Sequence, residues 1–349
     1  MDEQRIKLCV LLSTLAASVL TYQLQEATVY WDAAQKSVIL REGVMETEGG
    51  AYGYFNDTLL LSDGWGVLEI SAGHGGITQE DETTFFLAGY LEGYLTAGQM
   101  FNHYSNMYPQ LIKDEKVLNP LKRFLRRNFH RDFTDSNRSS FSLHNSCTYN
   151  SQYMVVDLSR VSLGHSIRDG ALTVVEQIPG KVLHSDQTQA LRRGYWPSYN
   201  IPFHAEIYNL SGYGVMWKRY GEDFSYDLCP RAKILRRDQA KVFDLSSLKH
   251  IMRYNNYRRD PYSKGHPCKT ICCRNDLRPR RPRPGGCYDT KVTDYQMAVQ
   301  LAAEAINGPT TQGGLRPFSW QSFNLTTHQG LPHTYSFPFI TMRPTMRLP

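Results

Sequence analysis

The chain has 349 residues, of which 41% are hydrophobic and 12% aromatic. This is enough apolar material for one large folded domain or two ordinary ones, and it excludes an intrinsically disordered chain. The formal net charge is only +6, and the basic residues gather at 122–138 and 258–283. Such clusters attract nucleic acid or anionic lipid headgroups, but the second is rich in proline and cysteine, so we predict a constrained surface loop there.

The first twenty residues predict a secretory signal peptide. Arg5 and Lys7 precede an apolar run, 8–20, which has small residues near its end and is short for a membrane span. We expect cleavage near residue 20, which removes Cys9 and leaves six cysteines. No second apolar run approaches spanning length, so we expect a soluble mature chain in the lysosome or outside the cell.

Four N-x-Ser/Thr sequons support this compartment. Each alone is weak evidence, but together with a signal peptide they predict a glycoprotein. Their asparagines are Asn56, Asn137, Asn209 and Asn324.

Short strands open the predicted fold. Residues 28–40 predict two strands around a turn, and 51–75 contains aromatic and β-branched segments broken by turn residues, which indicates sequential antiparallel strands. After residue 75 the spacing of the apolar residues changes. Apolar residues recur at spacings of three and four over 81–107, which predicts one long helix or two short ones, and a second helix with a basic face is expected over 111–129.

A second group of elements follows a polar connection. Residues 149–158 predict a buried strand, with a hairpin partner at 170–177. The segment 190–213 has no clean period and predicts an ordered loop, 226–242 predicts a basic strand or helix, and 245–254 has helical spacing.

Polar side chains are dense at the start of the strand predicted over 149–158. They have two uses: to satisfy turn backbone and neighbouring loops, which the residue types alone favour, or to donate to a developing oxyanion. The residues are Asn145, Thr148, Tyr149, Asn150 and Gln152.

The cysteines predict disulfides. Cys268, Cys272, Cys273 and Cys287 lack the paired C-x-x-C spacing of structural zinc sites, and a secreted chain meets oxidising conditions, so we expect two disulfides among them. Three pairings remain open, except that adjacent Cys272 and Cys273 are not expected to pair. Cys147 and Cys229 either pair with each other or remain free thiols.

Common catalytic motifs are absent from the sequence. It has no P-loop, G-x-S-x-G, H-E-x-x-H or dinucleotide fingerprint, and no two histidines stand at metal-ligand spacing, so we predict no metal and no cofactor. Cys147 stands in a polar turn as a tempting nucleophile, but no base is adjacent in the sequence. We therefore interpret Cys147 as a surface or disulfide cysteine.

Long segments, in one order along the chain, resemble the phospholipase B-like family, which is related to lamina ancestor. Those before residue 112 are AYGYFND (51–57), GWGVLEI (64–70), AGYLEGYLTA (88–97) and HYSNMYPQL (103–111). Those after it include TYN (148–150) with QYMVVDL, VEQIPG (175–180), LRRGYWPSYNIPFH (191–204), YDLCPRAKILRRDQAKV (226–242), IMRYNNYRRDPYS (251–263), CKTICCRNDL (268–277), PGGCYDTKV (284–292), GPTTQGG (308–314), THQG (327–330) and FPFITMRP (337–344).

The resemblance implies an α+β fold of the N-terminal nucleophile hydrolase type, a four-layer αββα sandwich. In this design the precursor cleaves itself, and the new N-terminal cysteine supplies the nucleophile and, through an α-amine with a pKa of about 8, the base. It further implies hydrolysis of acyl esters or amides, with glycerophospholipids as substrates. The implied partners are phospholipid or a membrane surface, and not nucleic acid.

The chain departs from the family in its centre. The relatives carry a long block with the nucleophile in a Cys-Ser-Ala-Leu segment, where this chain has only DFTDSNRSSFSL (132–143). We therefore expect an incomplete sandwich, in which 21–138 and 145–349 are two parts of one domain joined at 139–144. Cys147 does not replace the nucleophile, because the family usually has glycine there.

By likeness to related amidases, the resemblance makes Asn150 an oxyanion-hole candidate and Arg231 and Arg193 weaker candidates for substrate or strand-end contacts. Three functions remain open. The chain is an active phospholipase or an amidase of the same fold, a shortened form without activity, or a lipid- or glycan-binding glycoprotein that uses the basic segment 278–283. The missing block predicts that the purified chain releases no fatty acid from phosphatidylcholine.

Overall fold

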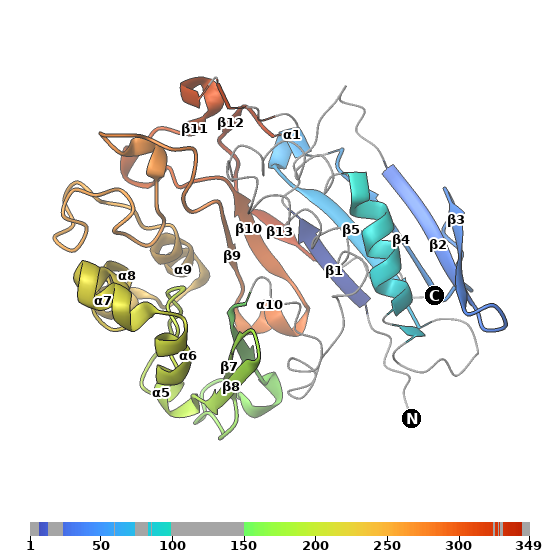
Figure 1. Cartoon of the computed structure of the whole chain (residues 1–349), viewed down its shortest axis with the longest axis horizontal. Coiled ribbons are helices and arrows are strands. Elements are labelled where there is room, and N and C mark those ends of the chain that lie inside the picture. The colour runs from blue at the N-terminus through green and yellow to red at the C-terminus, as the bar shows by residue number, and fades with distance from the viewer. Residues whose placement is uncertain are drawn as a thin grey trace. The chain divides into compact units, whose positions relative to one another are not determined.

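The computed structural model describes residues 7–12, 24–58, 60–73, 83–84, 86–98, 150–323, 325–326, 328 and 331–343. The chain divides into two compact units. The first comprises 1–135, 306–308 and 318–349, and the second comprises 136–305 and 309–317. Figure 1 labels their elements.

A five-stranded antiparallel sheet forms the first unit, in the order β1-β5-β4-β2-β3. The predicted succession of antiparallel strands is therefore confirmed, with a short helix, α1 (Leu60–Asp63), inserted before β5. β1 falls within the expected signal peptide, which stays a prediction. The strands are β1 (Lys7–Leu12), β2 (Leu24–Asp32), β3 (Ser37–Glu42), β4 (Ala51–Asn56) and β5 (Gly66–Ala72).

A helix over residues 86–98 covers this sheet, as Figure 1 shows. Leu87, Leu91 and Leu95, spaced by four, are fully buried against Phe55 and Leu68. This is the apolar stripe expected of a helix packed on a sheet, and it confirms the helical period within 81–107. The helix predicted over 111–129 lies outside the described residues.

The C-terminal segment adds short elements to the first unit. β11 (Phe318–Ser319) pairs antiparallel with β12 (Thr334–Tyr335), and η6 (Trp320–Phe323) and β13 (Ile340–Met342) lie nearby in the sequence. Asn307 donates a hydrogen bond to the carbonyl of Gly64, whose φ of +84° only glycine adopts readily.

The second unit begins with a three-stranded antiparallel sheet, β6-β7-β8. The strands are β6 (Gln152–Val156), β7 (Leu172–Ile178) and β8 (Lys181–Asp186), with η1 (Leu158–Arg160) after β6. The predicted hairpin of β6 and β7 is confirmed, but the predicted burial is wrong. Met154, Val155 and Val156 are each nearly half exposed, because β6 is an edge strand of this sheet.

Short helices joined by loops follow β8 in the second unit. Of the alternatives for 226–242, the structure has a helix, α8, with Pro230 in its first turn. The predicted helix over 245–254 is confirmed as α9, which begins at a capping box between Asp244 and Ser247. The elements are α5 (Thr188–Arg192), α6 (Ala205–Leu210), α7 (Tyr213–Tyr220), η2 (Gly221–Phe224), α8 (Pro230–Asp238), η3 (Gln239–Lys241), α9 (Leu245–Met252), η4 (Asn275–Leu277), β9 (Asp289–Val292), α10 (Tyr295–Val299), β10 (Ala303–Asn307) and η5 (Gln312–Gly314).

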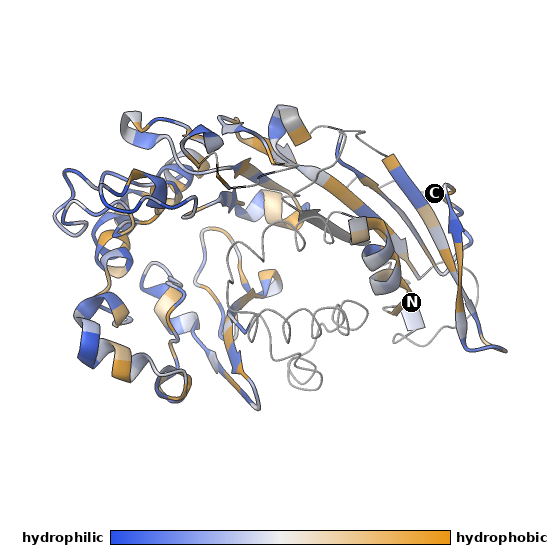
Figure 2. Cartoon of the chain, turned by 45° about the horizontal axis from the view of Figure 1, so that its top comes forward, coloured by the Kyte–Doolittle hydropathy of each residue, from blue (hydrophilic) through white to orange (hydrophobic). Residues whose placement is uncertain are grey.

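Two disulfides and a buried arginine hold the segment after α9. Of the pairings that the sequence left open, the structure has Cys268 with Cys273 and Cys272 with Cys287. Arg274 is fully buried beside them, whereas the nearby arginines at 280, 281 and 283 are exposed. Figure 2 colours most of this loop-rich segment as hydrophilic, in keeping with the predicted constrained surface loop.

The structure also bears on membrane and metal sites. Within the described ranges, no helix has the length and apolar character needed to cross a membrane. Among the same residues, no cluster of three histidine, cysteine or acidic side chains is arranged to hold a metal ion.

Candidate functional site

The residues selected by resemblance lie on separate elements of the second unit. Asn150 comes two residues before β6. Arg193 caps the C-terminus of α5, where its backbone N–H donates to Ala190 and its side chain is exposed. Cys147 lies outside the described residues.

Arg231 binds the loop that precedes α6. Its guanidinium donates to Asn200 Oδ1 at 2.8 Å and to the carbonyl of Tyr199. Burial lowers the pKa of Arg231. These hydrogen bonds fix the loop onto the start of α8, so the observed role of Arg231 is to position backbone.

Cys229 lines a cavity of about 310 Å³ beside Arg231, His266 and Lys269. It is a free thiol, 3% exposed, which decides between the two alternatives left open for this residue. Burial raises the pKa of the thiol. Because the thiolate is the reactive form, Cys229 is a poor nucleophile at neutral pH.

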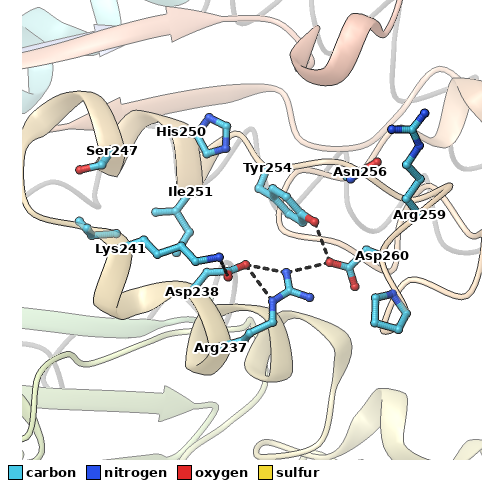
Figure 3. Close-up of a pocket in the computed structure, with 12 residues that line it drawn as sticks. Arg237, Asp238, Lys241, Ser247, His250, Ile251, Tyr254, Asn256, Arg259 and Asp260 are labelled. Atoms are coloured by element: carbon cyan, nitrogen blue, oxygen red, sulfur yellow. Dashed lines mark hydrogen bonds and ion pairs between the residues drawn. The ribbon is translucent and has the colours of Figure 1, made fainter.

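A second cavity, of about 370 Å³, lies between α8 and α9 (Figure 3). Arg237 bridges Asp238 at 2.5 Å and Asp260 at 2.8 Å, and Tyr254 donates to Asp260 at 2.7 Å. Lys241 also binds Asp238, at 2.7 Å. These charges satisfy one another at the cavity wall, which makes the cluster a link between α8 and the segment that follows α9.

A series of hydrogen-bonded side chains, Ser185, His204 and Glu176, which we call the relay, connects β8 and β7 to the start of α6. Ser185 Oγ on β8 is 2.8 Å from His204 Nε2, and His204 Nδ1 is 2.7 Å from Glu176 Oε2 on β7. His204 is the N-cap residue of α6. These distances make the hydroxyl, the imidazole and the carboxylate one hydrogen-bonded unit.

The carboxylate of Glu176 is fixed from several sides. It is 2% exposed and accepts hydrogen bonds at 2.7 Å from the Gln152 side chain and from the backbone N–H groups of Phe203 and His204. An ionised carboxylate only accepts hydrogen bonds. We therefore assign the proton of His204 to Nδ1, which leaves Nε2 as the acceptor facing Ser185.

No pattern in the sequence predicted this relay. Glu176 lies in VEQIPG and His204 ends LRRGYWPSYNIPFH, so both residues are in segments that carried the resemblance. They are 28 residues apart, however, and Ser185 is 19 residues from His204. No short motif joins them, and His204 was one of several scattered histidines.

Known proteins align with most of this chain. The family model described as Phospholipase B matches residues 51–139 and 133–342. Human phospholipase B-like 1 is 35% identical in an alignment of 510 positions, which includes 92% of this chain and 92% of the human one. Bovine phospholipase B-like 1 is 34% identical over 529 residues, covering 98% of this chain and 97% of its own. Phospholipase B of Crotalus adamanteus is 33% identical over 515 residues, covering 92% and 93%.

The alignments also locate a difference in length. Each spans more than 500 positions, whereas the whole chain has 349 residues, so the relatives hold residues that have no counterpart here. The two stretches of the family model meet at 133–139, next to the junction predicted at 139–144. Similarity on both sides of this junction extends through both compact units. The chain therefore belongs to the phospholipase B family.

Proposed function

We propose that this protein hydrolyses acyl esters and removes fatty acyl chains from glycerophospholipids. The observation that carries the proposal is the family match over residues 51–139 and 133–342, together with relatives named phospholipase B-like 1 and phospholipase B. As part of the same proposal, the antiparallel sheets and their helices belong to an αββα sandwich of the N-terminal nucleophile hydrolase type.

Surface chemistry supports a lipid substrate. Residues 280, 281 and 283 are exposed arginines, which attract anionic headgroups. On β6, Met154 and Val156 offer exposed apolar side chains. We propose contact with a membrane surface through such residues, without insertion of a spanning helix.

The compartment belongs to the same proposal. We place the protein in the lysosome or outside the cell, delivered by the signal peptide and glycosylated. Asn209 is exposed on α6 and Asn56 is half-buried at the end of β4, whereas Asn137 and Asn324 lie outside the described residues. The two disulfides agree with an oxidising compartment.

A second candidate is a lipid-binding glycoprotein without turnover. The observation that favours it is the central length that the relatives have and this chain does not. In this case the exposed arginines bind anionic membranes and no acyl bond breaks.

One experiment separates the two candidates. The glycosylated chain, purified from the medium of expressing cells, is mixed with vesicles of phosphatidylcholine alone or with phosphatidylserine. Released fatty acid and cosedimented protein are measured at low and high salt. Release of fatty acid supports the hydrolase. Salt-sensitive cosedimentation without release supports the binding protein and contradicts the hydrolase.

A further inference from the structure

We propose that the cavity at the start of α8 binds a phosphate group through the side chains of Arg231, Lys269 and His266. Two ligands supply this chemistry, the phosphodiester headgroup of a glycerophospholipid and free inorganic phosphate. The choice of a headgroup rests on the proposed function, whereas the site itself does not require that an acyl bond be broken.

The cavity is formed by three segments of the second unit. Asp223 comes from η2, Cys229 and Arg231 stand at the start of α8, and His266 and Lys269 belong to the disulfide-bonded segment after α9. Its volume of about 310 Å³ lies at the lower end of the range of small-molecule sites, about 300–1,000 Å³. A small polar ligand therefore fits it better than an acyl chain.

Arg231 brings a positive charge that has no carboxylate partner. Its guanidinium donates to Asn200 Oδ1 and to the carbonyl of Tyr199, which are both neutral acceptors. In the described part of the chain, Arg231 forms no ion pair. A guanidinium has five N–H donors, so others remain for a ligand. Because charges removed from water need a counterion, an anion in the cavity would stabilise Arg231.

His266 offers a further donor. Its Nδ1 accepts a hydrogen bond from the backbone N–H of Cys268 at 3.1 Å. Burial and the nearby charges of Arg278 and Lys269 lower the pKa of His266, which keeps the ring neutral at pH 7. We therefore assign its proton to Nε2. Among the described residues, no acceptor binds Nε2, so its N–H is available to a phosphate oxygen.

The charges of the cavity wall favour a single negative charge. Lys269 and Arg231 are cations, and Asp223 pairs with Lys269 at 2.6 Å. With a neutral His266, two cations and one carboxylate give these lining residues a net charge of +1. A phosphodiester carries one negative charge and would neutralise them.

The start of α8 adds to this potential. Cys229 is the N-cap residue of α8, a helix of nine residues, and it lines the cavity together with Pro230. The N-terminal end of a helix carries a partial positive charge and favours anions. The helix and the side chains thus attract the same kind of ligand.

Calorimetry tests binding without turnover. The full glycosylated chain is titrated with glycerophosphocholine, with inorganic phosphate and with choline chloride, which has no phosphate, all at one ionic strength. We expect heat of binding from the first two ligands and none from choline. Affinity for glycerophosphocholine that is about tenfold or more above that for phosphate identifies the headgroup as the ligand. Equal affinities identify free phosphate.

Two variants remove groups that would face the ligand. His266→Asn keeps a side-chain oxygen as acceptor for the Cys268 N–H but has no equivalent of Nε2–H, and Lys269→Gln removes a charge. We expect each to weaken binding by about tenfold or more. The matched control is Lys218→Gln, at an exposed lysine of α7 that does not line the cavity, and it should bind as the wild type does. Circular dichroism checks the folding of each variant.

Asp223→Asn gives an effect of opposite sign. It removes the carboxylate from the cavity wall and frees Lys269, so we expect binding to become about threefold tighter. If the pair of Asp223 and Lys269 only holds the fold, this variant binds no more tightly than the wild type.

The thiol of Cys229 locates the ligand. Cys229 is 3% exposed and lines the cavity. Its modification by N-ethylmaleimide is followed by mass spectrometry of the peptide that contains it. Ligand at ten times its dissociation constant should slow the modification about tenfold, because only the unoccupied cavity admits the reagent.

Three results would overturn the inference. They are the absence of heat from both phosphate ligands at millimolar concentration, equal weakening by Lys218→Gln and Lys269→Gln, and modification of Cys229 at the same rate with ligand bound. None of these measurements involves release of fatty acid. A chain that binds phosphate but hydrolyses no lipid therefore keeps this inference and loses the proposed hydrolase function, and the reverse result does the opposite.

Discussion

Glu176 Oε2 accepts two hydrogen bonds from His204, one from the ring Nδ1 and one from the backbone N–H, both at 2.7 Å. The same residue therefore fixes the orientation of the imidazole and the start of α6. Since Glu176 also accepts from the backbone N–H of Phe203, the carboxylate anchors the end of the loop that precedes α6. The position of this loop on the sheet consequently depends on one buried side chain.

The first prediction concerns this anchor. Glu176→Ala leaves buried donors of Phe203 and His204 without an acceptor, and we expect the free energy of unfolding to fall by about 3 kcal/mol. Urea unfolding followed by fluorescence measures the change. The control is Glu206→Ala, since Glu206 is half exposed in an ion pair with Lys181 and its loss costs under about 1 kcal/mol. Equal effects of the two variants would contradict the anchoring role.

The second prediction concerns the fully buried guanidinium of Arg274. It binds both oxygens of Asp276, at 2.8 and 2.6 Å, and the carbonyl of Thr310 at 2.6 Å. Removing one partner of a buried pair strands the other charge, so Arg274→Met should lower the free energy of unfolding by about 3–5 kcal/mol. Arg280→Met, at an exposed arginine of the same segment, should change it by less than about 0.5 kcal/mol.

A double variant tests the cause. Arg274→Met combined with Asp276→Leu removes both charges, and we expect much of the lost stability to return. If the double variant is less stable than Arg274→Met alone, the loss comes from packing and not from an unpaired carboxylate.

The third prediction ranks the two disulfides. Cys272 and Cys287 are separated by 15 positions, whereas Cys268 and Cys273 are separated by 5. Because a longer closed loop restricts the unfolded chain more, replacing both cysteines of the 272–287 disulfide with alanine should cost about 3 kcal/mol, and the other pair about 2 kcal/mol. Thermal unfolding of the two double variants gives the order. A reversed order would show that the loop-entropy argument does not govern this segment.

The fourth prediction concerns acid stability. Burial acts to raise the pKa of Asp260, but hydrogen bonds from Arg237 and Tyr254 outweigh it and hold the pKa below its ordinary value. The Asp260 carboxylate therefore takes up a proton at a higher pH in the unfolded chain than in the folded chain. The stabilisation is complete well above the ordinary aspartate pKa of about 3.9 and is lost as the pH falls below it.

Unfolding free energies at pH 7 and pH 3 test this sign. Asp260→Asn should lose less stability than the wild type between the two pH values, because it has no carboxylate to protonate there. Asp169→Asn, at a carboxylate that is 82% exposed beside Arg192, serves as the control and should follow the wild type. If Asp260→Asn loses as much stability between pH 7 and pH 3 as the wild type does, Asp260 is not the source of the acid sensitivity.

The fifth prediction concerns glycosylation. Asn209 is exposed on α6, so its sequon is accessible in the folded protein. Asn209→Gln should remove one glycan, so the variant should run further in a gel than the wild type. Glycosidase treatment should remove this difference in mobility. Asn200→Gln, an asparagine outside any sequon, should leave the mobility unchanged. An identical mobility of Asn209→Gln and wild type would show that this sequon is not used.

Local patterns in the sequence predicted many of the elements. The apolar spacing of Leu87, Leu91 and Leu95 indicated a helix, because that period is imposed by helix geometry. The aromatic and β-branched segments within 51–75, broken by turn residues, indicated paired strands. The disulfide cysteines were predicted from their spacing and from the oxidising compartment that the sequence led us to expect. Their pairing was not, because any of three connections satisfies the same sequence.

The sequence by itself determined the family, the periodic elements and the set of cysteines that pair. Only the tertiary structure decided that the apolar β6 is an edge strand and that Arg231 holds a loop. It also decided that Glu176, Ser185 and His204 meet. The physical reason is that a strand's burial and a side chain's partners depend on which distant segments pack against it. Hydrogen bonds over 19 and 28 residues leave no local period in the sequence.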